Sequence, residues 1–277
     1  MEPKKVIFIL KFMMSSFFQR LTLLIGPDAA AALQKSRIIV FGLGGVGSWC
    51  AEALVRSGIG RISLVDSDKV CPSNINRQLQ ATSSTIGRLK TEALEERLKD
   101  INPACEITTF PQVFSKENAE CFDIHGADYV IDAIDSLAHK LSLIETTLAA
   151  GVRLFSSMGM AQKLDPTRIR SADIWKTTGC PLARLVRQGL RKRGFSGHFT
   201  VVYSPESISR RFVDTAPPPP DDSVPVGTWD GGKKIINGTS VTVTAVAGLV
   251  LAGLVTQDLC KLEERPTVPL CGGVSSI

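Results

Sequence analysis

The 277-residue chain is predicted to adopt an α/β fold, in which a mainly parallel, doubly wound sheet carries helices on both faces. Three observations predict it. From about Ser36 on, short apolar and β-branched runs alternate with longer segments that are apolar on one face only. The first run ends in a glycine-rich turn that opens a helix. The composition, with 44% hydrophobic and 21% charged residues, is ordinary for a soluble globular chain with a large core.

Five strands and three helices account for this pattern. The strands are expected at residues 37–42, 61–66, 105–110, 127–135 and 151–157. The helices are expected at about Gly47 to Ser57, Ser84 to Lys99 and Leu137 to Ala150. Ser84 is placed as the cap of the second helix, while the first and third end before Gly58 and Gly151. A helix in every step between strands forces parallel pairing through right-handed crossovers.

The second half of the chain is expected to differ from the first. Beyond Gly159 the alternation breaks down, and residues 215–234 are rich in Pro, Gly and Asp, which is typical of a loop. We therefore expect an N-terminal extension and arm at 1–35, a Rossmann-like nucleotide-binding region at 36–159, and a substrate-binding region at 160–277. The last region completes the same domain with loops over the carboxyl edge of the sheet and one closing helix.

Net charge and cysteine usage limit the class of protein. A formal charge of +5 is compatible with a polyanionic partner but too small to require one. The seven cysteines include no C-x-x-C pair, so neither a zinc ribbon nor a disulfide framework is indicated, and a reducing cytoplasm fits. The apolar segment 241–255 is shorter than the ~20 residues that span a bilayer, so we expect a buried helix and no stable membrane insertion.

The sequence GLGGVG, at 42–47, follows a strand and opens a helix, which is the context in which G-x-G-x-x-G has meaning. Gly42 permits the tight turn, Gly44 lets a phosphate approach the backbone, and Gly47 lets the helix pack on the strand. Gly45 belongs to the same turn, and the helix N-terminus supplies positive potential. Asp66, at the end of the next strand, is placed to bind a ribose. Alone, these residues favour NAD(P), with a plain tight turn as the alternative.

The residues after Asp66 change this interpretation. Six polar or charged residues fall within one short loop: Asp66, Asp68, Asn74, Asn76, Arg77 and Gln78. Arg77 and the later Lys90 suit a grip on a triphosphate and its developing charge, for which NAD has no need. Asp135 ends the sequence DAID at the same carboxyl edge, where a Mg²⁺ bridging phosphates would lie. An Asp at a strand end is also a common helix cap.

In this combination the sequence resembles the ubiquitin-activating-like, ATP-dependent adenylating enzymes, the ThiF/MoeB/HesA family. The family pattern is a glycine-rich turn followed by D-x-D-x-V-x-x-x-N-x-x-R-Q, then G-x-x-K, then D-x-x-D. The chain meets it with GLGGVG at 42–47, DSDKVCPSNINRQ at 66–78, GRLK at 87–90 and DAID at 132–135. The resemblance extends over about Phe17 to Cys260, and the combination of motifs is highly specific.

The resemblance implies ATP and Mg²⁺ as cofactors and assigns a role to each motif residue. Asp66 would bind the ribose, Asp135 the magnesium, and Gln78 would help to shape the pocket that Asp68 also lines. The phosphates would be bound by Asn74, Arg77 and Lys90. Arg77, Lys90 and Asp135 would thereby carry the catalysis.

The resemblance also implies a homodimer. Members of the family use an N-terminal R-(F/Y)-x-R motif whose second arginine reaches across the dimer to the partner's phosphates. This chain retains Arg20 at that position but has Phe17 in place of the first arginine. The contact across the dimer is therefore expected from Arg20 alone.

Three further stretches, EALVRSGIGRISLVD, DAIDS and CPLARLVRQGLRKRG, resemble one branch of the family. Its members use ATP to cyclise a threonylcarbamoyl group, with loss of water, on the tRNA adenosine beside the anticodon. A tRNA partner needs a basic surface, and one helical segment offers five cations: Arg184, Arg187, Arg191, Lys192 and Arg193. A solvated helix face with cations near its C-terminus is the alternative for this segment.

Other functions share part of this pattern. An activator of a small sulfur-carrier protein, adenylating its C-terminus, would share every ATP-site residue, but usually carries two zinc-binding C-x-x-C pairs. An NAD-dependent oxidoreductase would give Arg77, Lys90 and Asp135 no role. A degenerate protein that binds ATP without catalysing a reaction is a further alternative, because Phe17 replaces the first arginine of the family motif. Cys180, before the basic helix, is interpreted as an ordinary thiol rather than a thioester- or persulfide-forming one. Whether a sulfur-transfer protein assists stays open.

Overall fold

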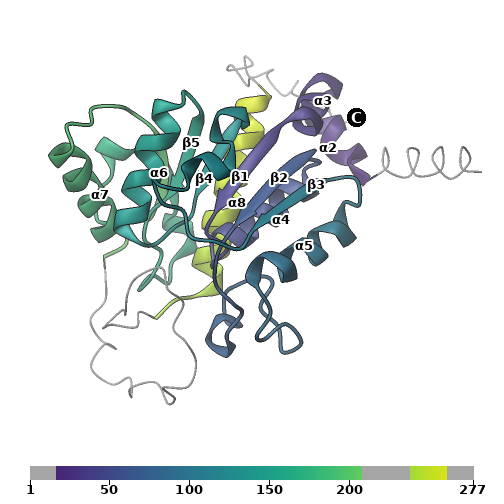
Figure 1. The fold of residues 1–277 in the computed structure, drawn as a ribbon, viewed down its shortest axis with the longest axis horizontal. Coiled ribbons are helices and arrows are strands. Elements are labelled where there is room, and N and C mark those ends of the chain that lie inside the picture. Colours follow the sequence, from purple (N-terminus) through teal and green to yellow (C-terminus); the bar gives the residue numbers. More distant parts are fainter. Residues whose placement is uncertain (1–16, 208–237, 261–277) are drawn as a thin grey trace, which may run out of the picture.

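The computed structural model describes residues 17–207 and 238–260 (Figure 1). Residues 1–16 of the expected extension and the expected loop at 215–234 lie outside them. The strands in chain order are β1 (Arg37–Phe41), β2 (Arg61–Val65), β3 (Glu106–Phe110), β4 (Tyr129–Asp132), β5 (Arg153–Ser157), β6 (Arg170–Asp173) and β7 (Thr200–Tyr203). The helices are α2 (Gln19–Ile25), α3 (Pro27–Lys35), α4 (Gly47–Arg56), α5 (Lys90–Ile101), α6 (Leu137–Ala149), α7 (Pro181–Lys192) and α8 (Val241–Leu259).

The strands of the described residues form one sheet in the order β3-β2-β1-β4-β5-β7-β6. Neighbouring strands are parallel except β7 and β6, which pair antiparallel. The predicted fold class, a mainly parallel, doubly wound α/β sheet, is thus confirmed. The chain order reverses between β1 and β4, and doubly wound sheets bind ligands at such a switch point, outside the carboxyl ends of the strands.

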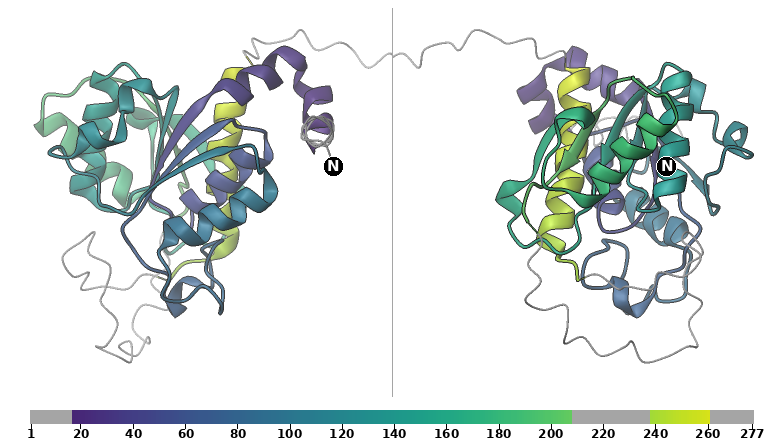
Figure 2. Two further views of the ribbon diagram at one scale, coloured as in Figure 1. Left: turned by 45° about the vertical axis from the view of Figure 1, so that its right-hand side comes forward. Right: turned by 90° about the vertical axis from the view of Figure 1, so that its left-hand side faces the viewer.

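Two apolar cores lie on opposite faces of the sheet. One core gathers residues of α3, α4, α5 and α8, and the other gathers residues of α6 and α7 (Figures 1 and 2). Strand β1 feeds both cores, since Ile38 and Val40 belong to the first, whereas Ile39 and Phe41 belong to the second. A continuous apolar run of this kind is what a strand covered on both faces requires.

Helix α8 closes the first core. Its residues Val243, Ala247, Leu251 and Val255 are fully buried, and a Cβ on Gly248 would lie only 2.4 Å from the Val46 carbonyl oxygen of the α4 N-terminus. The helix expected here is confirmed, but at 19 residues it is long and apolar enough to cross a membrane by length and composition. The prediction that this segment is too short to span a bilayer was therefore wrong. The helix is assigned to the core because one of its faces packs against α4.

The expectation of loops beyond Gly159 is wrong in part. Strands β6 and β7 extend the sheet beyond β5, whereas the two helices of this region, α7 at the predicted basic segment and α8 at its end, were both expected. Both strands have only four residues, and β6 is an antiparallel edge strand on which Arg170 and Ser171 are exposed. An edge strand need not be apolar on both faces, so the pattern that revealed the other strands is missing.

Two expectations about connections are also wrong. Ser84 does not cap a helix, because α5 begins only at Lys90, after Leu89. The preceding residues turn instead: Thr85 Oγ1 donates to the Gln80 carbonyl oxygen at 2.7 Å, and Gly87 has a φ of +85°, which interrupts a right-handed helix. In addition, the step from β3 to β4 contains two 3₁₀ turns, at 119–122 and 124–126, and no α-helix.

Candidate nucleotide site

The glycine-rich turn lies at the switch point, between the carboxyl ends of β1 and β4. Gly42 has a φ of +88°, and a Cβ there would lie 2.8 Å from the Ala133 carbonyl oxygen. A Cβ on Gly47 would lie 1.8 Å from the Gly42 carbonyl oxygen, so both positions admit only glycine. A Cβ on Gly44 would meet no atom within 4 Å, which leaves the backbone open to an approaching phosphate. The N-terminus of α4 follows directly and supplies positive potential, although the Ser48 N–H already donates to the Gly44 carbonyl oxygen at 3.2 Å.

Asp66 is buried beneath this turn. Its Oδ2 accepts the Leu43 N–H at 2.7 Å, and its Oδ1 accepts the Asp68 N–H at 2.9 Å. Burial raises the pKa of the Asp66 carboxyl, although the nearby Lys90 ammonium opposes that shift. The carboxylate therefore fixes the glycine-rich turn, and each oxygen keeps a second lone pair for a donor such as a ribose hydroxyl.

Lys90 is buried and lies between two carboxylates. Its Nζ is 2.7 Å from Asp68 Oδ2 and 3.7 Å from Asp66 Oδ1. The start of α5 holds it there, because the Lys90 N–H also donates to the Asp68 carbonyl oxygen at 3.0 Å. The structure thus brings Asp66, Asp68 and Lys90 together, and a phosphate would have to share the ammonium with these carboxylates.

Arg77 is half-buried and held by its own loop. Its Nη1 donates to the Ser73 carbonyl oxygen and to Asn76 Oδ1, both at 2.9 Å, while Trp49 Nε1 donates to the Arg77 carbonyl oxygen at 3.0 Å. Burial lowers the pKa of the Arg77 guanidinium, and the charge of Asp135 partly offsets this. Arg77 and the exposed Asp135 are therefore electrostatic neighbours, as the sequence predicted for residues at one edge.

The remaining predicted residues of this loop are largely buried. Asn74 Oδ1 accepts the Cys71 N–H at 3.1 Å and so shapes the loop from within. Gln78 Oε1 is buried and has no hydrogen-bond partner among the described residues. A buried acceptor without a partner is unusual in a folded protein and fits a pocket that a ligand completes.

Sequence reasoning missed the residues that support the site. Trp49 anchors the Arg77 loop, and Gln80 Nε2 donates to the Leu43 carbonyl oxygen of the glycine-rich turn at 2.8 Å. Asp132, the first carboxylate of DAID, is fully buried and bonded to Lys140 Nζ at 2.7 Å. Two spacings in the sequence could have indicated Gln80 and Lys140. Gln80 lies two residues after Gln78, and Lys140 lies about one helical turn after Ser136.

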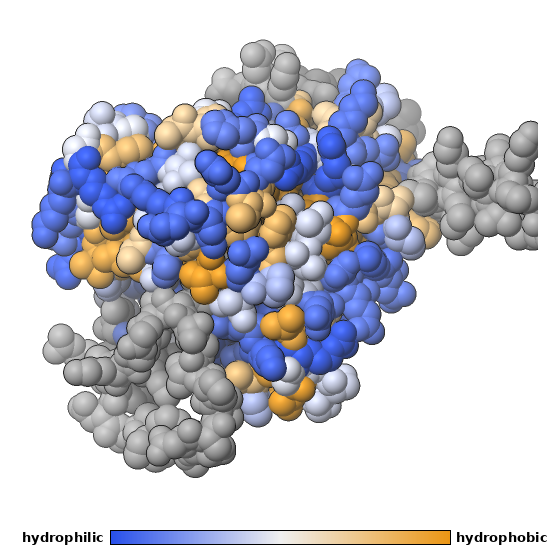
Figure 3. All heavy atoms as spheres, in the orientation of Figure 1, coloured by the Kyte–Doolittle hydropathy of each residue, from blue (hydrophilic) through white to orange (hydrophobic). Residues whose placement is uncertain are grey.

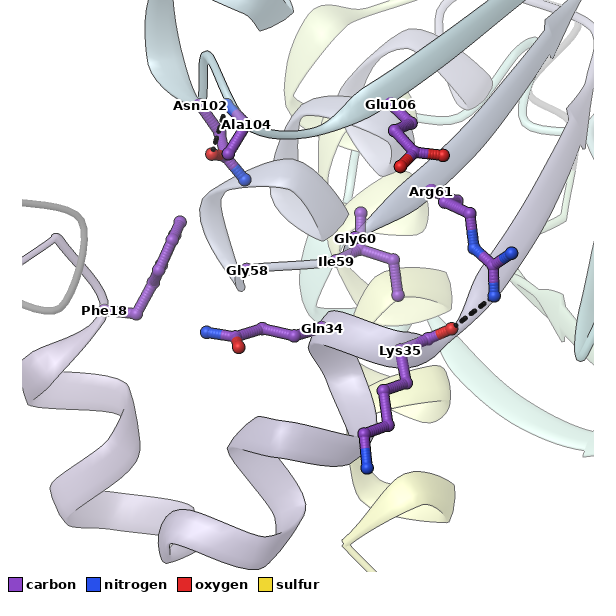
Figure 4. Close-up of a pocket in the computed structure, with 10 residues that line it drawn as sticks. All are labelled: Phe18, Gln34, Lys35, Gly58, Ile59, Gly60, Arg61, Asn102, Ala104 and Glu106. Carbon is purple, nitrogen blue, oxygen red and sulfur yellow. Dashed lines mark hydrogen bonds between the residues drawn. The ribbon is translucent and has the colours of Figure 1, made fainter. Parts of the chain in front are cut away.

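Arg20 lies away from these residues. Helix α2 packs at the amino edge of the sheet, where the neighbouring Phe18 ring covers Gly58 before β2. A cleft of about 390 Å³ opens at the same edge, lined among others by Phe18, Gln34, Arg61 and Glu106 (Figure 4). None of the predicted nucleotide residues lines this cleft, so its volume does not locate the site.

The predicted basic helix is α7, and its cations differ in availability. Arg187 Nη1 bonds to Thr177 Oγ1, the Arg191 guanidinium stacks 5.3 Å from the Trp175 ring centre, and Arg193 pairs with Glu145 at 2.7 Å. Arg184, Arg191, Lys192 and Arg193 are exposed, whereas Arg187 is partly buried. The left side of Figure 3, where α7 lies, carries a band of strongly hydrophilic residues.

Helix α7 starts at the carboxyl edge of the sheet. Cys180 precedes it, and its Sγ lies 3.9 Å from the carbonyl oxygen of Gly159, just beyond the carboxyl end of β5. The thiol itself is buried, with 4% of the residue exposed. The first turns of α7 therefore share the carboxyl edge with the glycine-rich turn, and its last turns lie toward the amino edge.

A doubly wound sheet with a glycine-rich helix start at its switch point, flanked by the buried Lys90 and the half-buried Arg77, defines a nucleotide-binding α/β protein. The model of the ThiF family matches residues 18–269. The chain belongs to the ThiF family, which confirms the resemblance seen in its motifs.

The proteins similar to this chain include three tRNA threonylcarbamoyladenosine dehydratases. The chain is 41% identical to the tRNA threonylcarbamoyladenosine dehydratase of Bacillus subtilis, over 88% of this chain and 94% of that protein. It is 48% identical to the Haemophilus influenzae enzyme of the same name, over 60% of this chain and 64% of that one. The solved structure of Escherichia coli tRNA N6-threonylcarbamoyladenosine dehydratase in complex with ATP superimposes with a TM-score of 0.77, at 31% identity, over 89% and 95% of the two chains.

Proposed function

We propose that this protein catalyses the ATP-dependent dehydration of threonylcarbamoyladenosine in tRNA, next to the anticodon, and so closes a ring in the modified base. The observation that carries the proposal is the similarity to the Bacillus subtilis dehydratase, which extends over nearly the whole of both chains. The nucleotide residues at the switch point agree with it. The function class is then a tRNA-modifying enzyme of the adenylating type.

The chemistry needs little beyond positioning and charge. A carboxylate oxygen is a poor leaving group, so the threonyl carboxylate attacks a phosphorus of ATP and displaces pyrophosphate. The carbamoyl group then attacks the activated carbonyl carbon, loses a proton and displaces AMP. The sum is loss of water from the substrate coupled to cleavage of ATP. Charge develops on the phosphates, where Arg77 and Lys90 are available to stabilise it.

Magnesium is part of the proposal. Among the described residues, no group of three or more Cys, His, Asp or Glu side chains could hold a metal ion. Mg²⁺ in nucleotide sites is commonly bound through one or two carboxylates together with the substrate phosphates, which neutralises phosphate charge. The exposed Asp135, close to the charge of Arg77, fits that single-carboxylate role.

The test of the function is mass spectrometry of nucleosides from tRNA that bears threonylcarbamoyladenosine, after incubation with the protein and Mg-ATP. We expect the modified nucleoside to lose the mass of one water only when ATP is present. An unchanged nucleoside, with ATP consumed only after addition of small carrier proteins, would contradict the proposal and favour activation of a carrier C-terminus.

The exposed cations of α7 are proposed to bind tRNA. We expect Arg184→Glu with Lys192→Glu to raise the KM for tRNA about tenfold, and to lower the salt slope of tRNA binding by about two, since two phosphate contacts are lost. The KM for ATP should not change. Steady-state kinetics at several salt concentrations measure all three quantities.

The matched control for this prediction is Lys35→Glu with Lys99→Glu. It makes the same change in net charge on α3 and α5, which pack on the other face of the sheet. An equal rise in tRNA KM in both double variants would mean that net charge, not the α7 surface, attracts the tRNA.

A homodimer is proposed for two reasons. The exposed side of α8 is apolar, including Leu249 at 49% exposure, and α2 exposes Leu23 and Leu24 at 80% and 77%. Arg20 lies at the opposite edge of the sheet from its own nucleotide residues, so a contact with phosphates requires a second subunit. Light scattering should give twice the 29.9 kDa mass of the chain, and a monomer at micromolar concentration would exclude this role for Arg20.

A reducing cytoplasm is proposed as the location. Cys50, Cys71, Cys105, Cys121 and Cys180 are free thiols, and burial raises the pKa of the Cys105 thiol to about 12. These thiols are consistent with a compartment in which disulfides do not form.

A further inference from the structure

A fully buried ion pair lies beneath the edge of the nucleotide site. Asp132, at the end of β4, and Lys140, on α6, both have no exposed surface, and Lys140 Nζ is 2.7 Å from Asp132 Oδ2. Lys140 Nζ also donates to the Ser157 carbonyl oxygen at 3.0 Å and lies 3.3 Å from Ser156 Oγ. Ser156 Oγ in turn donates to Asp132 Oδ2 at 2.6 Å. The ammonium thus has three acceptors for its three hydrogens.

The second oxygen of Asp132 holds the turn that follows β4. Asp132 Oδ1 accepts the Ile134 N–H at 3.1 Å, which fixes the backbone one residue before Asp135. The same turn packs against the glycine-rich turn, because the Ala133 carbonyl oxygen lies only 2.8 Å from the position of a Cβ on Gly42. One buried carboxylate therefore fixes the backbone of the turn that leads to Asp135.

Stability alone does not account for this pair. Burying two charges carries a large desolvation cost, and well-packed apolar residues of similar size are often as stabilising or more so. Unlike apolar residues, the pair can orient a backbone group. Asp132 Oδ2 is held by the Lys140 ammonium and the Ser156 hydroxyl, so Asp132 Oδ1 faces the turn in one fixed direction. Neither Asp132 nor Lys140 has an exposed surface through which to touch a substrate.

We propose that Asp132 and Lys140 are positioning residues: Asp132 holds the 133–135 turn so that Asp135 points at the magnesium of Mg-ATP, and Lys140 neutralises and orients Asp132. The inference rests on the proposed use of Mg-ATP. It assigns the two aspartates of DAID separate tasks, one buried and structural to the turn, one exposed and facing the metal.

The test is calorimetric titration with ATP, once with Mg²⁺ and once with EDTA, because this readout needs no tRNA. The single variant Lys140→Met leaves a buried carboxylate without its cation and risks not folding. The decisive variants are therefore double. Asp132→Val with Lys140→Met removes both charges and the acceptor for the Ile134 N–H, whereas Asp132→Asn with Lys140→Met removes both charges but keeps an acceptor oxygen.

The quantity compared is the factor by which Mg²⁺ raises the affinity for ATP. We expect this factor to be about tenfold smaller in the Val/Met variant than in the wild type, a loss typical of residues that support metal ligands. Its affinity in EDTA should stay within about twofold. The Asn/Met variant should keep most of the magnesium gain. Asp135→Asn provides the reference for full loss, and Thr147→Val, a fully buried change on the same helix, should behave as wild type.

Three results would overturn the inference. The first is that magnesium raises the ATP affinity of the Val/Met variant as much as that of the wild type. The second is that both double variants lose ATP affinity equally with and without metal while their melting temperatures fall, because this would show that the pair only stabilises the fold. The third is that magnesium does not change the ATP affinity of the wild type. A wild type with the magnesium gain but without tRNA dehydration would instead contradict the proposed function and leave the inference standing.

Discussion

Replacing Arg77 with Met is expected to lower kcat about 10²- to 10³-fold, the usual loss when one preorganised donor to a developing charge is removed. The guanidinium is fixed before ATP arrives, because Ser73 and Asn76 accept from its Nη1 and Trp49 anchors its backbone. Such preorganisation acts on the transition state more than on bound ATP. The KM for ATP should therefore rise only a few-fold, as measured by steady-state kinetics at saturating tRNA.

Arg88→Met is the matched control for this variant. Arg88 lies in the same connection between β2 and α5, but it is 41% exposed in its side chain and pairs with Glu96 at 2.7 Å. Exposed pairs of this kind contribute little to stability, so kcat should stay within about twofold of wild type. If Arg77→Met also kept kcat near that of the wild type, Arg77 would have no catalytic role.

The parts of this molecule that sequence reasoning predicted are those that local chemistry determines. The glycine-rich turn and the positions of Asp66 and Arg77 follow from a strand, a tight turn and a motif within one stretch of chain. Strands β6 and β7 were missed because their pairing depends on distant residues, and β6 in particular has no apolar pattern of its own. The start of α5 was misplaced since Gly87 and the Thr85 hydroxyl favour a turn over a cap at Ser84.

The two aspartates of DAID show the same limit within the site. Asp132 ends a buried strand and Asp135 follows it, and no spacing rule distinguishes an exposed carboxylate from a buried one three residues away. The distinction appears only when α6 folds back and places Lys140 against Asp132. The sequence could therefore predict a carboxylate at this edge of the sheet, but which of the two aspartates is exposed depends on a contact between two elements.

Replacing Gly47 with Ala is expected to lower the free energy of unfolding by about 3 kcal/mol, in the range of severe overpacking. The new Cβ would lie 1.8 Å from the Gly42 carbonyl oxygen and 3.2 Å from the Ala133 Cβ, so the whole glycine-rich turn must move. For a chain of this size the melting temperature should fall by about 10 °C. ATP binding should be lost with the turn, as calorimetry would show.

Gly44→Ala separates these two effects. Its Cβ would meet no atom within 4 Å, and the backbone at Gly44 is not left-handed, so the melting temperature should match that of the wild type. A methyl group there nonetheless occupies the space through which a phosphate approaches the backbone, and ATP affinity should fall about tenfold or more because the close N–H contacts are lost. Normal ATP affinity in a stable Gly44→Ala protein would place the phosphates elsewhere, and the assignment of the fingerprint to ATP would then fail.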